Sequence, residues 1–286
     1  MITNLNYLFL LIIILYSFGT KFAIAADTPR YLSLISENDI YSPNAQDRHY
    51  SNSLRLGFSI HANNKQLRII NSLLNNSQST KYRNEAAFGH NIYTPENFIS
   101  KDLQENDRPF AGWLYGEFTR IANTSNTEKA IGLSIGAVGP AALGKQIQTL
   151  NHSIINDPKP LGWNNQLNNE PTILVKYRWS KFSSLINSEK ISIGLISRLG
   201  INLGNVFTDA GGGLLLRIGS YLPHYEMPLR IESGYSGNSS FLVIRKNQFD
   251  WQVFTEIQGR GVFQNIFLDG NTFSNSHSVE KKKFVW

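Results

Sequence analysis

The sequence contains no cysteine in 286 residues, so disulfide bonds are excluded. After the first 25 residues it also lacks any hydrophobic stretch as long as a membrane-spanning helix, which needs roughly 20 apolar residues. The remaining chain is therefore either a soluble exported protein or a membrane β-barrel, whose strands alternate apolar and polar residues.

Several motifs of known chemistry are absent as well. The sequence has no phosphate-binding glycine loop, no zinc-ligand spacing, no GxSxG motif and no nucleic-acid-binding signature, so no nucleic-acid partner is expected. Its formal net charge of +6 suits an anionic partner such as a lipid phosphate, although ordinary surface lysines would give the same value.

The N-terminus has the pattern of a signal peptide over residues 1–25. An apolar run from Leu8 to Tyr16 is followed by Ala23-Ile24-Ala25, a small-x-small cleavage pattern. An uncleaved membrane anchor is the alternative, but the run is short for a membrane span. We therefore expect an exported protein whose single β domain occupies residues 26–286.

Most of the chain shows the alternation of β-strands. The clearest case is residues 53–61, where Leu54, Leu56, Phe58 and Ile60 alternate with polar or small residues. Further strands are predicted at 31–36, 86–92, 111–121, 131–137, 172–179, 191–204, 214–219 and 251–258, whereas 221–247 has no clear pattern.

Two all-β architectures fit this alternation. A soluble sandwich buries the apolar faces, whereas a membrane barrel turns them outward to lipid. The polar faces favour the barrel, because they combine glycines with basic residues, as a narrow barrel interior does. These basic residues are Arg55, Lys176, Arg178, Arg198 and Arg217.

One stretch, residues 140–155, interrupts the strands with helical spacing. Pro140 stands where a helix start tolerates proline, and Gln148 and His152 are four positions apart, on one helix face. The predicted apolar stripe, expected to dock the helix, consists of Leu143, Ile147, Leu150 and Ile154.

A few polar residues are candidates for a catalytic site. His152 suits general-base work near neutral pH, although a helix histidine is more often a surface residue. Asn38 and Asp39, at a strand end, have oxygen ligands for a hard cation but are also typical of turns. Ser51 would come close to them if strands 31–36 and 53–61 form a hairpin.

Several motifs, in this order and spacing, resemble the lipid A 3′-O-deacylase family of Gram-negative outer membranes. The resemblance covers most of residues 30–286. It rests on Glu37-Asn38-Asp39, Asp47-Arg48-His49-Tyr50-Ser51-Asn52-Ser53, Asn91-Ile92-Tyr93-Thr94-Pro95, Asp107-Arg108-Pro109-Phe110-Ala111-Gly112-Trp113, Gln148-Thr149-Leu150-Asn151-His152 and Gly162-Trp163-Asn164-Asn165-Gln166.

The resemblance implies a 12-stranded outer-membrane barrel with a site between its wall and a loop helix. The implied reaction is Ca²⁺-dependent hydrolysis of the ester that holds the 3′-linked acyloxyacyl group of lipid A. By this resemblance, His152 activates water and Gln148 contacts the site from the helix. Asn38, Asp39 and Ser51 would place the cation.

The resemblance also suggests partners and location. Arg48 and Arg108 are predicted to meet lipid A phosphates, since arginine suits bidentate phosphate contacts. We expect a monomer in the outer membrane, in contact with lipopolysaccharide and other outer-membrane lipids.

Two departures from the family pattern leave alternatives open. Asn91 stands where some relatives are expected to have Asp, and the chain ends about two strands before the family's barrel would close. The sequence therefore also allows a truncated, non-catalytic barrel. An outer-membrane phospholipase with a serine nucleophile is the other alternative.

Overall fold

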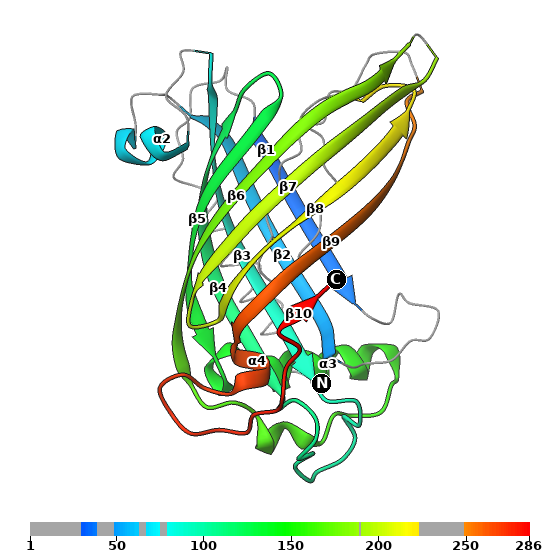
Figure 1. Ribbon diagram of the computed structural model, residues 1–286. Helices are drawn as coiled ribbons and strands as arrows, with labels where there is room; N and C mark the ends of the chain where they lie inside the picture. The colour runs from blue at the N-terminus through cyan, green and yellow to red at the C-terminus, as the bar shows by residue number, and fades with distance from the viewer. Residues whose placement is uncertain (1–29, 39–48, 63–66, 75–78, 189, 223–248) are drawn as a thin grey trace.

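A computed structural model of the protein describes residues 30–38, 49–62, 67–74, 79–188, 190–222 and 249–286. In these ranges ten strands form one sheet, ordered as they occur in the chain, and every neighbouring pair is antiparallel. Figure 1 shows the long strands tilted and curved around a common interior, with connections at both ends. The predicted all-β class is confirmed.

Most strands are longer than the sequence pattern indicated. The strands are β1 (Arg30–Asn38), β2 (His49–Ala62), β3 (Lys81–Thr94), β4 (Ala111–Asn123), β5 (Thr127–Val138), β6 (Glu170–Asn187), β7 (Ser192–Gly204), β8 (Phe207–Gly219), β9 (Gln252–Asn265) and β10 (Phe284–Val285). The helical segments are α2 (Arg68–Leu74), η2 (Pro140–Ala142), α3 (Gly144–Ile155), η3 (Gly162–Asn165) and α4 (Ile266–Asp269).

The sheet is open rather than closed. Among the described residues, β1 pairs with β2 and β10 pairs with β9, and no pairing joins β1 to β10. The contact of β10 with β9 covers two residue pairs, Phe284 with Gly261 and Val285 with Arg260. The ten strands are thus fewer than the 12 that the family resemblance implied.

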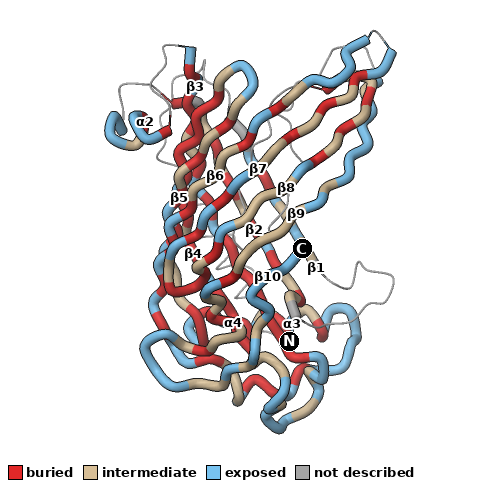
Figure 2. Tube along the Cα trace, viewed as in Figure 1, coloured by how far each residue is buried: buried red, intermediate tan, exposed pale blue. Residues whose placement is uncertain are grey.

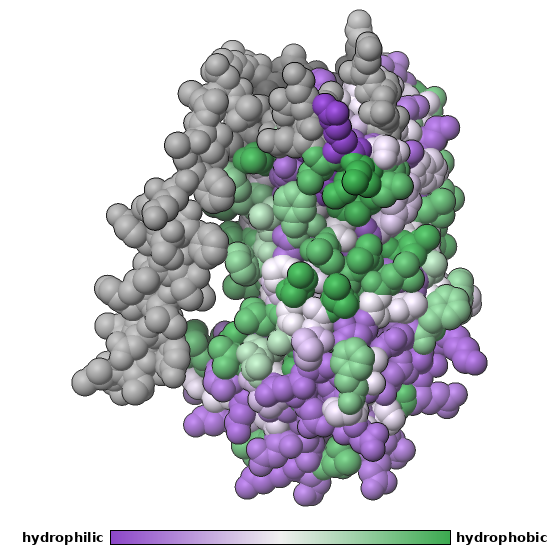
Figure 3. Space-filling model, turned by 90° about the vertical axis from the view of Figure 1, so that its left-hand side faces the viewer, coloured by the Kyte–Doolittle hydropathy of each residue, from purple (hydrophilic) through white to green (hydrophobic). Residues whose placement is uncertain are grey.

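The two faces of the sheet differ as a membrane barrel requires. Figure 2 shows buried and exposed residues alternating along the strands. Outward residues such as Leu54, Phe88, Ile135 and Leu199 are between 45% and 60% exposed. Figure 3 shows the hydrophobic residues as a band across the middle of one face, above a hydrophilic lower end. Because a soluble sandwich would bury this face, the alternation favours the barrel.

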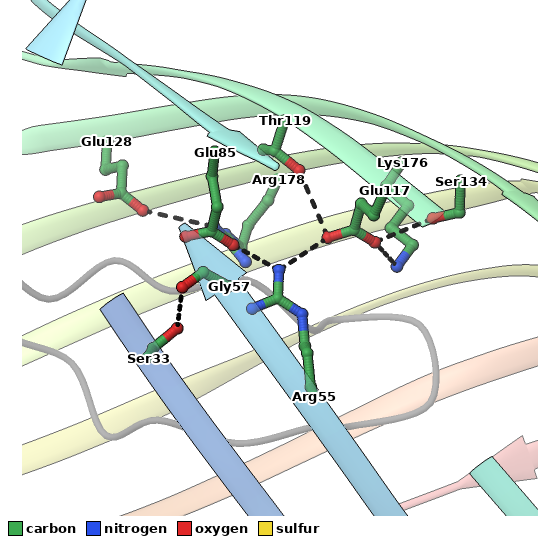
Figure 4. A network of polar contacts seen from close by, with 10 residues as sticks. All are labelled: Ser33, Arg55, Gly57, Glu85, Glu117, Thr119, Glu128, Ser134, Lys176 and Arg178. Atoms are coloured by element: carbon green, nitrogen blue, oxygen red, sulfur yellow. Dashed lines mark hydrogen bonds and ion pairs between the residues drawn. The ribbon is translucent and has the colours of Figure 1, made fainter. Parts of the chain in front are cut away.

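The interior contains a network of ion pairs contributed by several strands (Figure 4). Arg55 Nη2 lies 3.1 Å from Glu117 Oε1 and also contacts Glu85, while Lys176 Nζ lies 2.5 Å from Glu117 Oε2. Ser134 Oγ donates a further hydrogen bond of 2.8 Å to Glu117. These side chains are almost fully buried, so the predicted basic interior face is confirmed at Arg55 and Lys176.

An aromatic cluster closes the interior at the end that carries α3 and α4. Tyr93 and Phe267 stack with their ring centroids 3.7 Å apart, and Trp113 stacks on Tyr115 at 4.1 Å. The loop that follows α4 is fixed by Glu170, which accepts hydrogen bonds from Asn271, Thr272 and Phe273. We refer to this end of the molecule as the loop end.

Some predictions fall outside the described residues. The signal peptide at 1–25 does so entirely, as does most of the unassigned segment 221–247. The short helices α2 and α4 were not predicted from the sequence. No helix in the part of the chain that the structure describes is long and apolar enough to cross a membrane.

Candidate active site between the sheet and helix α3

Helix α3 packs on the outer face of the sheet at the loop end. His90, on β3, donates from Nε2 to the carbonyl oxygen of Ala142 at 2.8 Å, since a carbonyl can only accept. Gly112 on β4 meets Gly144 so closely that an added Cβ would lie 3.0 Å from the Gly144 backbone. The glycine pair therefore lets the helix start lie directly on the strand.

The helix is present over the predicted residues, but its faces are not used as predicted. Its buried residues are Gly144, Gln148 and His152. The apolar stripe is largely exposed: Leu143 by 48%, Leu150 by 39% and Ile154 by 72%. Only Ile147 of that stripe packs against a buried cluster. The prediction that the apolar stripe docks the helix is wrong, because the polar face of the helix makes the contact with the sheet.

Gln148 is held by an indole group from the loop that follows the helix. Trp163, in η3, donates from Nε1 to Gln148 Oε1 at 2.8 Å. Trp163 packs against Phe110 with ring centroids 5.1 Å apart, in a cluster that includes Ile92 on β3 and Phe98. The carboxamide of Gln148 is thus held in one orientation by a buried donor.

His152 has a defined hydrogen-bonding arrangement on one ring nitrogen. Its Nδ1 lies 2.6 Å from the carbonyl oxygen of Pro158 and 3.2 Å from Asp157 Oδ2. Because the carbonyl can only accept, Nδ1 carries a proton, and in the neutral ring Nε2 then has the lone pair. The ring also meets Phe98 edge-on at 5.3 Å between centroids. This is the tautomer that a general base acting through Nε2 requires.

The facing strands contribute hydroxyl groups from a β-bulge. The register of β2 with β3 shifts between Tyr50 and Asn52, so that Ser51 is the extra residue. Ser51 Oγ forms a short hydrogen bond with Thr94 Oγ1, and both residues are buried. Asn38 at the end of β1 pairs in register with Asn52, so strands β1 and β2 form the predicted hairpin.

The other predicted site residues are placed apart or not described. Asp39 and Arg48 lie outside the described residues. Arg108 lies near Tyr93 of the aromatic cluster, and burial lowers its pKa even though neighbouring Tyr93 and Asp107 oppose this shift. Its role as a phosphate contact stays a prediction.

Several groups at this site were not singled out from the sequence. Phe98 and the Pro158 carbonyl come from connections whose path only the folded chain defines, whereas Thr94 ends strand β3 and belongs to a quoted motif that gave it no role. Trp163 belongs to a quoted motif, but no pattern indicates that its indole would reach Gln148 over 15 positions. A buried polar residue on the packing face of a helix, such as Gln148, is the signal that implies such a partner.

The described residues offer hydroxyl oxygens as ligands for a cation but no cluster of carboxylate, imidazole or thiol ligands. Among them, no group of three or more His, Cys, Asp or Glu side chains is placed to hold a metal ion. The hydroxyl oxygens of Ser51 and Thr94 are hard donors of the type that Ca²⁺ accepts. The predicted carboxylate ligand, Asp39, lies outside the described residues, so Ca²⁺ at this position stays a prediction.

Comparison with known proteins gives a family for the whole domain. Residues 8–286 match the family described as outer membrane protein LpxR. The chain belongs to the LpxR family. No curated protein matches the chain. Among solved structures, LpxR from Salmonella typhimurium is similar, with 20% sequence identity and a TM-score of 0.69, over 90% of this chain and 85% of that chain.

At that identity, the likeness to Salmonella LpxR concerns the fold. The LpxR match includes every residue predicted for the site, from Asn38 to His152. It supports an outer-membrane location and agrees with the outward apolar face of the strands. The family resemblance noted in the sequence is therefore confirmed.

Proposed function

We propose that the protein is a carboxylic ester hydrolase that removes the 3′-linked acyloxyacyl group of lipid A, with His152 as the general base that activates water. Membership of the LpxR family and the fold shared with Salmonella LpxR support a lipid A deacylase. The observation that carries the mechanism is the hydrogen bond of 2.6 Å from His152 Nδ1 to the Pro158 carbonyl.

In this mechanism His152 Nε2 takes a proton from the attacking water. The water oxygen attacks the ester carbonyl carbon to form a tetrahedral intermediate. When this intermediate collapses, the bond from the acyl carbon to the 3′ oxygen breaks, and the imidazolium of His152 returns its proton to that oxygen, which gives the free 3′ hydroxyl and the released acyloxyacyl fatty acid. Asp157, 3.2 Å from Nδ1, stabilises the imidazolium that forms transiently. The side chain of Asp157 is 40% exposed, so solvent weakens this contribution.

Other residues would place the ester for attack. Gln148, whose carboxamide oxygen accepts from Trp163, would orient or contact the site from the helix. We propose that Asn38, Asp39 and Ser51 hold Ca²⁺, which when bound would supply positive charge to the developing oxyanion. That the protein acts as a monomer, with Arg48 and Arg108 as phosphate contacts, also stays a prediction.

The decisive experiment is mass spectrometry of lipid A from cells that express the chain. We expect loss of the 3′ acyl chains with the native chain in Ca²⁺, and unchanged lipid A with His152→Ala or with a chelator. Ser153→Ala is the matched control, because Ser153 is the neighbouring exposed residue on the same helix. Unchanged deacylation by His152→Ala would rule out this mechanism.

The two alternatives have less support. A serine nucleophile needs an adjacent base, but the partner that the structure gives Ser51 is the hydroxyl of Thr94. Labelling by a serine-directed phosphonate would favour that phospholipase. A non-catalytic barrel would leave lipid A intact with every variant, including the native chain.

A further inference from the structure

Helix α3 carries an unusual distribution of side chains around its axis. At about 100° per residue, Leu150 and Ile154 lie on one line along the helix, and both are exposed, as is Leu143, which directly precedes the helix. Lys145 and Ser153 are exposed on the other side of the helix face that packs on the sheet, and they form a polar flank. The helix thus touches the sheet between an apolar flank and a polar flank.

The apolar flank continues a surface that already faces lipid. Gly112, which meets the helix start at Gly144, is followed on the outer face of β4 by Leu114, which is 40% exposed. Ile135 on neighbouring β5 is 60% exposed on the same face. In a member of an outer-membrane family these strand residues meet acyl chains. The exposed apolar residues of α3 add the width of one helix to this apolar surface.

A second helix marks the other edge of the band. Asn71 of α2 accepts a hydrogen bond of 3.0 Å from Arg120 Nε, also on the outer face of β4. Exposed apolar residues occur here too, with Ile69 at 81% and Leu73 at 65%.

The spacing of the two helices can be compared with a membrane. Gly112 and Arg120 are eight positions apart on β4, about 27 Å along a strand. At the usual strand tilt this is about 20 Å along the barrel axis, near the ~25 Å height of an apolar barrel band. Each helix therefore lies at one edge of the band, which is the membrane interface.

We propose that α3 is an interfacial helix whose exposed apolar residues Leu150 and Ile154 are embedded among the acyl chains of the leaflet at the loop end. Its polar flank, with Lys145, then faces water, as in amphipathic helices that lie in a membrane surface. The occupant of this apolar surface is leaflet lipid. This inference goes beyond the proposed function, because it concerns where the helix lies and does not depend on catalysis.

The arrangement would also explain why the polar face of α3 is its packing face. A helix in the interface gains by placing its apolar residues in lipid, so the sheet contact can be made by other residues. Gln148 and His152 are then held on the protein side, at the depth where a lipid ester lies. Exposure that would be unfavourable in water becomes favourable burial in acyl chains.

The absence of cysteine makes a direct test possible, because each introduced cysteine is a single labelling site. Full-length protein with Leu150→Cys, Ile154→Cys, Lys145→Cys or Ile135→Cys would be labelled with a nitroxide and reconstituted in phosphatidylcholine vesicles. Collision with oxygen, which concentrates in acyl chains, and with a water-soluble nickel complex would then be measured. All four positions are on the surface, so labelling leaves the core intact.

We expect the labels at Leu150 and Ile154 to match Ile135, with frequent oxygen collisions and few nickel collisions. The label at Lys145 should show the reverse. Nickel collisions at Ile154 equal to those at Lys145 would overturn the proposal, as would protection of Ile154 from both reagents. Because no activity is measured, this result is separate from the outcome of the deacylation experiment.

Discussion

Trp163 and Gln148 are joined by a buried hydrogen bond of 2.8 Å from the indole Nε1 to the carboxamide oxygen, which fixes the orientation of the amide on the packing face of α3. Both residues are almost fully buried, so neither polar group has water as a substitute partner. The indole therefore determines how the carboxamide of Gln148 is oriented.

Trp163→Phe should remove the hydrogen bond to Gln148 while keeping the ring packing against Phe110. We expect the deacylation rate to fall about tenfold, equivalent to ~1.4 kcal/mol, because Gln148 loses its fixed orientation. The double variant Trp163→Phe, Gln148→Ala should be no slower than Gln148→Ala alone. Rate losses that simply multiply in the double variant would show that Trp163 acts independently of Gln148.

Asp157→Asn should slow the reaction modestly and change its pH dependence. The carboxylate is partly exposed, so we expect a two- to fivefold loss, from about 0.5–1 kcal/mol. The acid limb of the pH–rate profile should move to lower pH, because the imidazolium of His152 loses a neighbouring negative charge. Asp102→Asn, an exposed carboxylate in another loop, should leave rate and profile unchanged; an identical profile for both variants would contradict the role of Asp157.

Gly144→Ala should displace α3 from the sheet. An added Cβ would lie 2.5 Å from the Trp163 ring and 3.0 Å from Gly112, closer than normal contact. We expect at least a tenfold loss of deacylation while the barrel still folds, measured by mass spectrometry and by resistance to heat unfolding. Gly116→Ala, on the same outer face of β4 as Gly112 with its nearest atom 3.9 Å away, is the control that should retain activity. Equal activity of the two variants would show that the close helix contact is dispensable.

Arg55→Ala should destabilise the barrel rather than alter the site. Removing this guanidinium leaves Glu85 and Glu117 buried with less compensating charge, at a cost of about 3–5 kcal/mol. Urea unfolding of the detergent-solubilised protein would measure the change. Lys181→Ala, at an exposed position, should be within about 0.5 kcal/mol of the native chain. A similarly small effect at Arg55 would mean that water or neighbouring groups replace its contacts.

The sequence predicted the strands well because alternation is a local property. Residues 53–61 follow the pattern without exception, and Arg55 was correctly assigned to the interior. Strand ends were missed where the alternating pattern is weak, as at Thr208 to Gly213 in β8. Helix α2 was missed because its seven residues are too few to show a helical period.

For the candidate site, the sequence predicted the helix but not its orientation. The spacing placed Gln148 and His152 on one face correctly, yet Leu150 and Ile154 were expected to be buried. That expectation holds for a helix surrounded by water, and lipid reverses it. The partners of the helix could not be predicted, since Trp163 and Pro158 reach it through a loop without a regular pattern.

The bulge at Ser51 changes which residues of β2 face the interior, the odd-numbered or the even-numbered ones. From Ser53 onward, odd-numbered residues point to the interior, whereas on the other side of the bulge the even-numbered Tyr50 contacts Tyr93 of the aromatic cluster. Deleting Ser51 would restore regular alternation with Tyr50 still paired to Tyr93 and facing the interior, and would remove one hydroxyl of the outer pair without touching an ion pair. The charged interior and the outer hydroxyl pair can therefore change separately during evolution, because one inserted residue uncouples them.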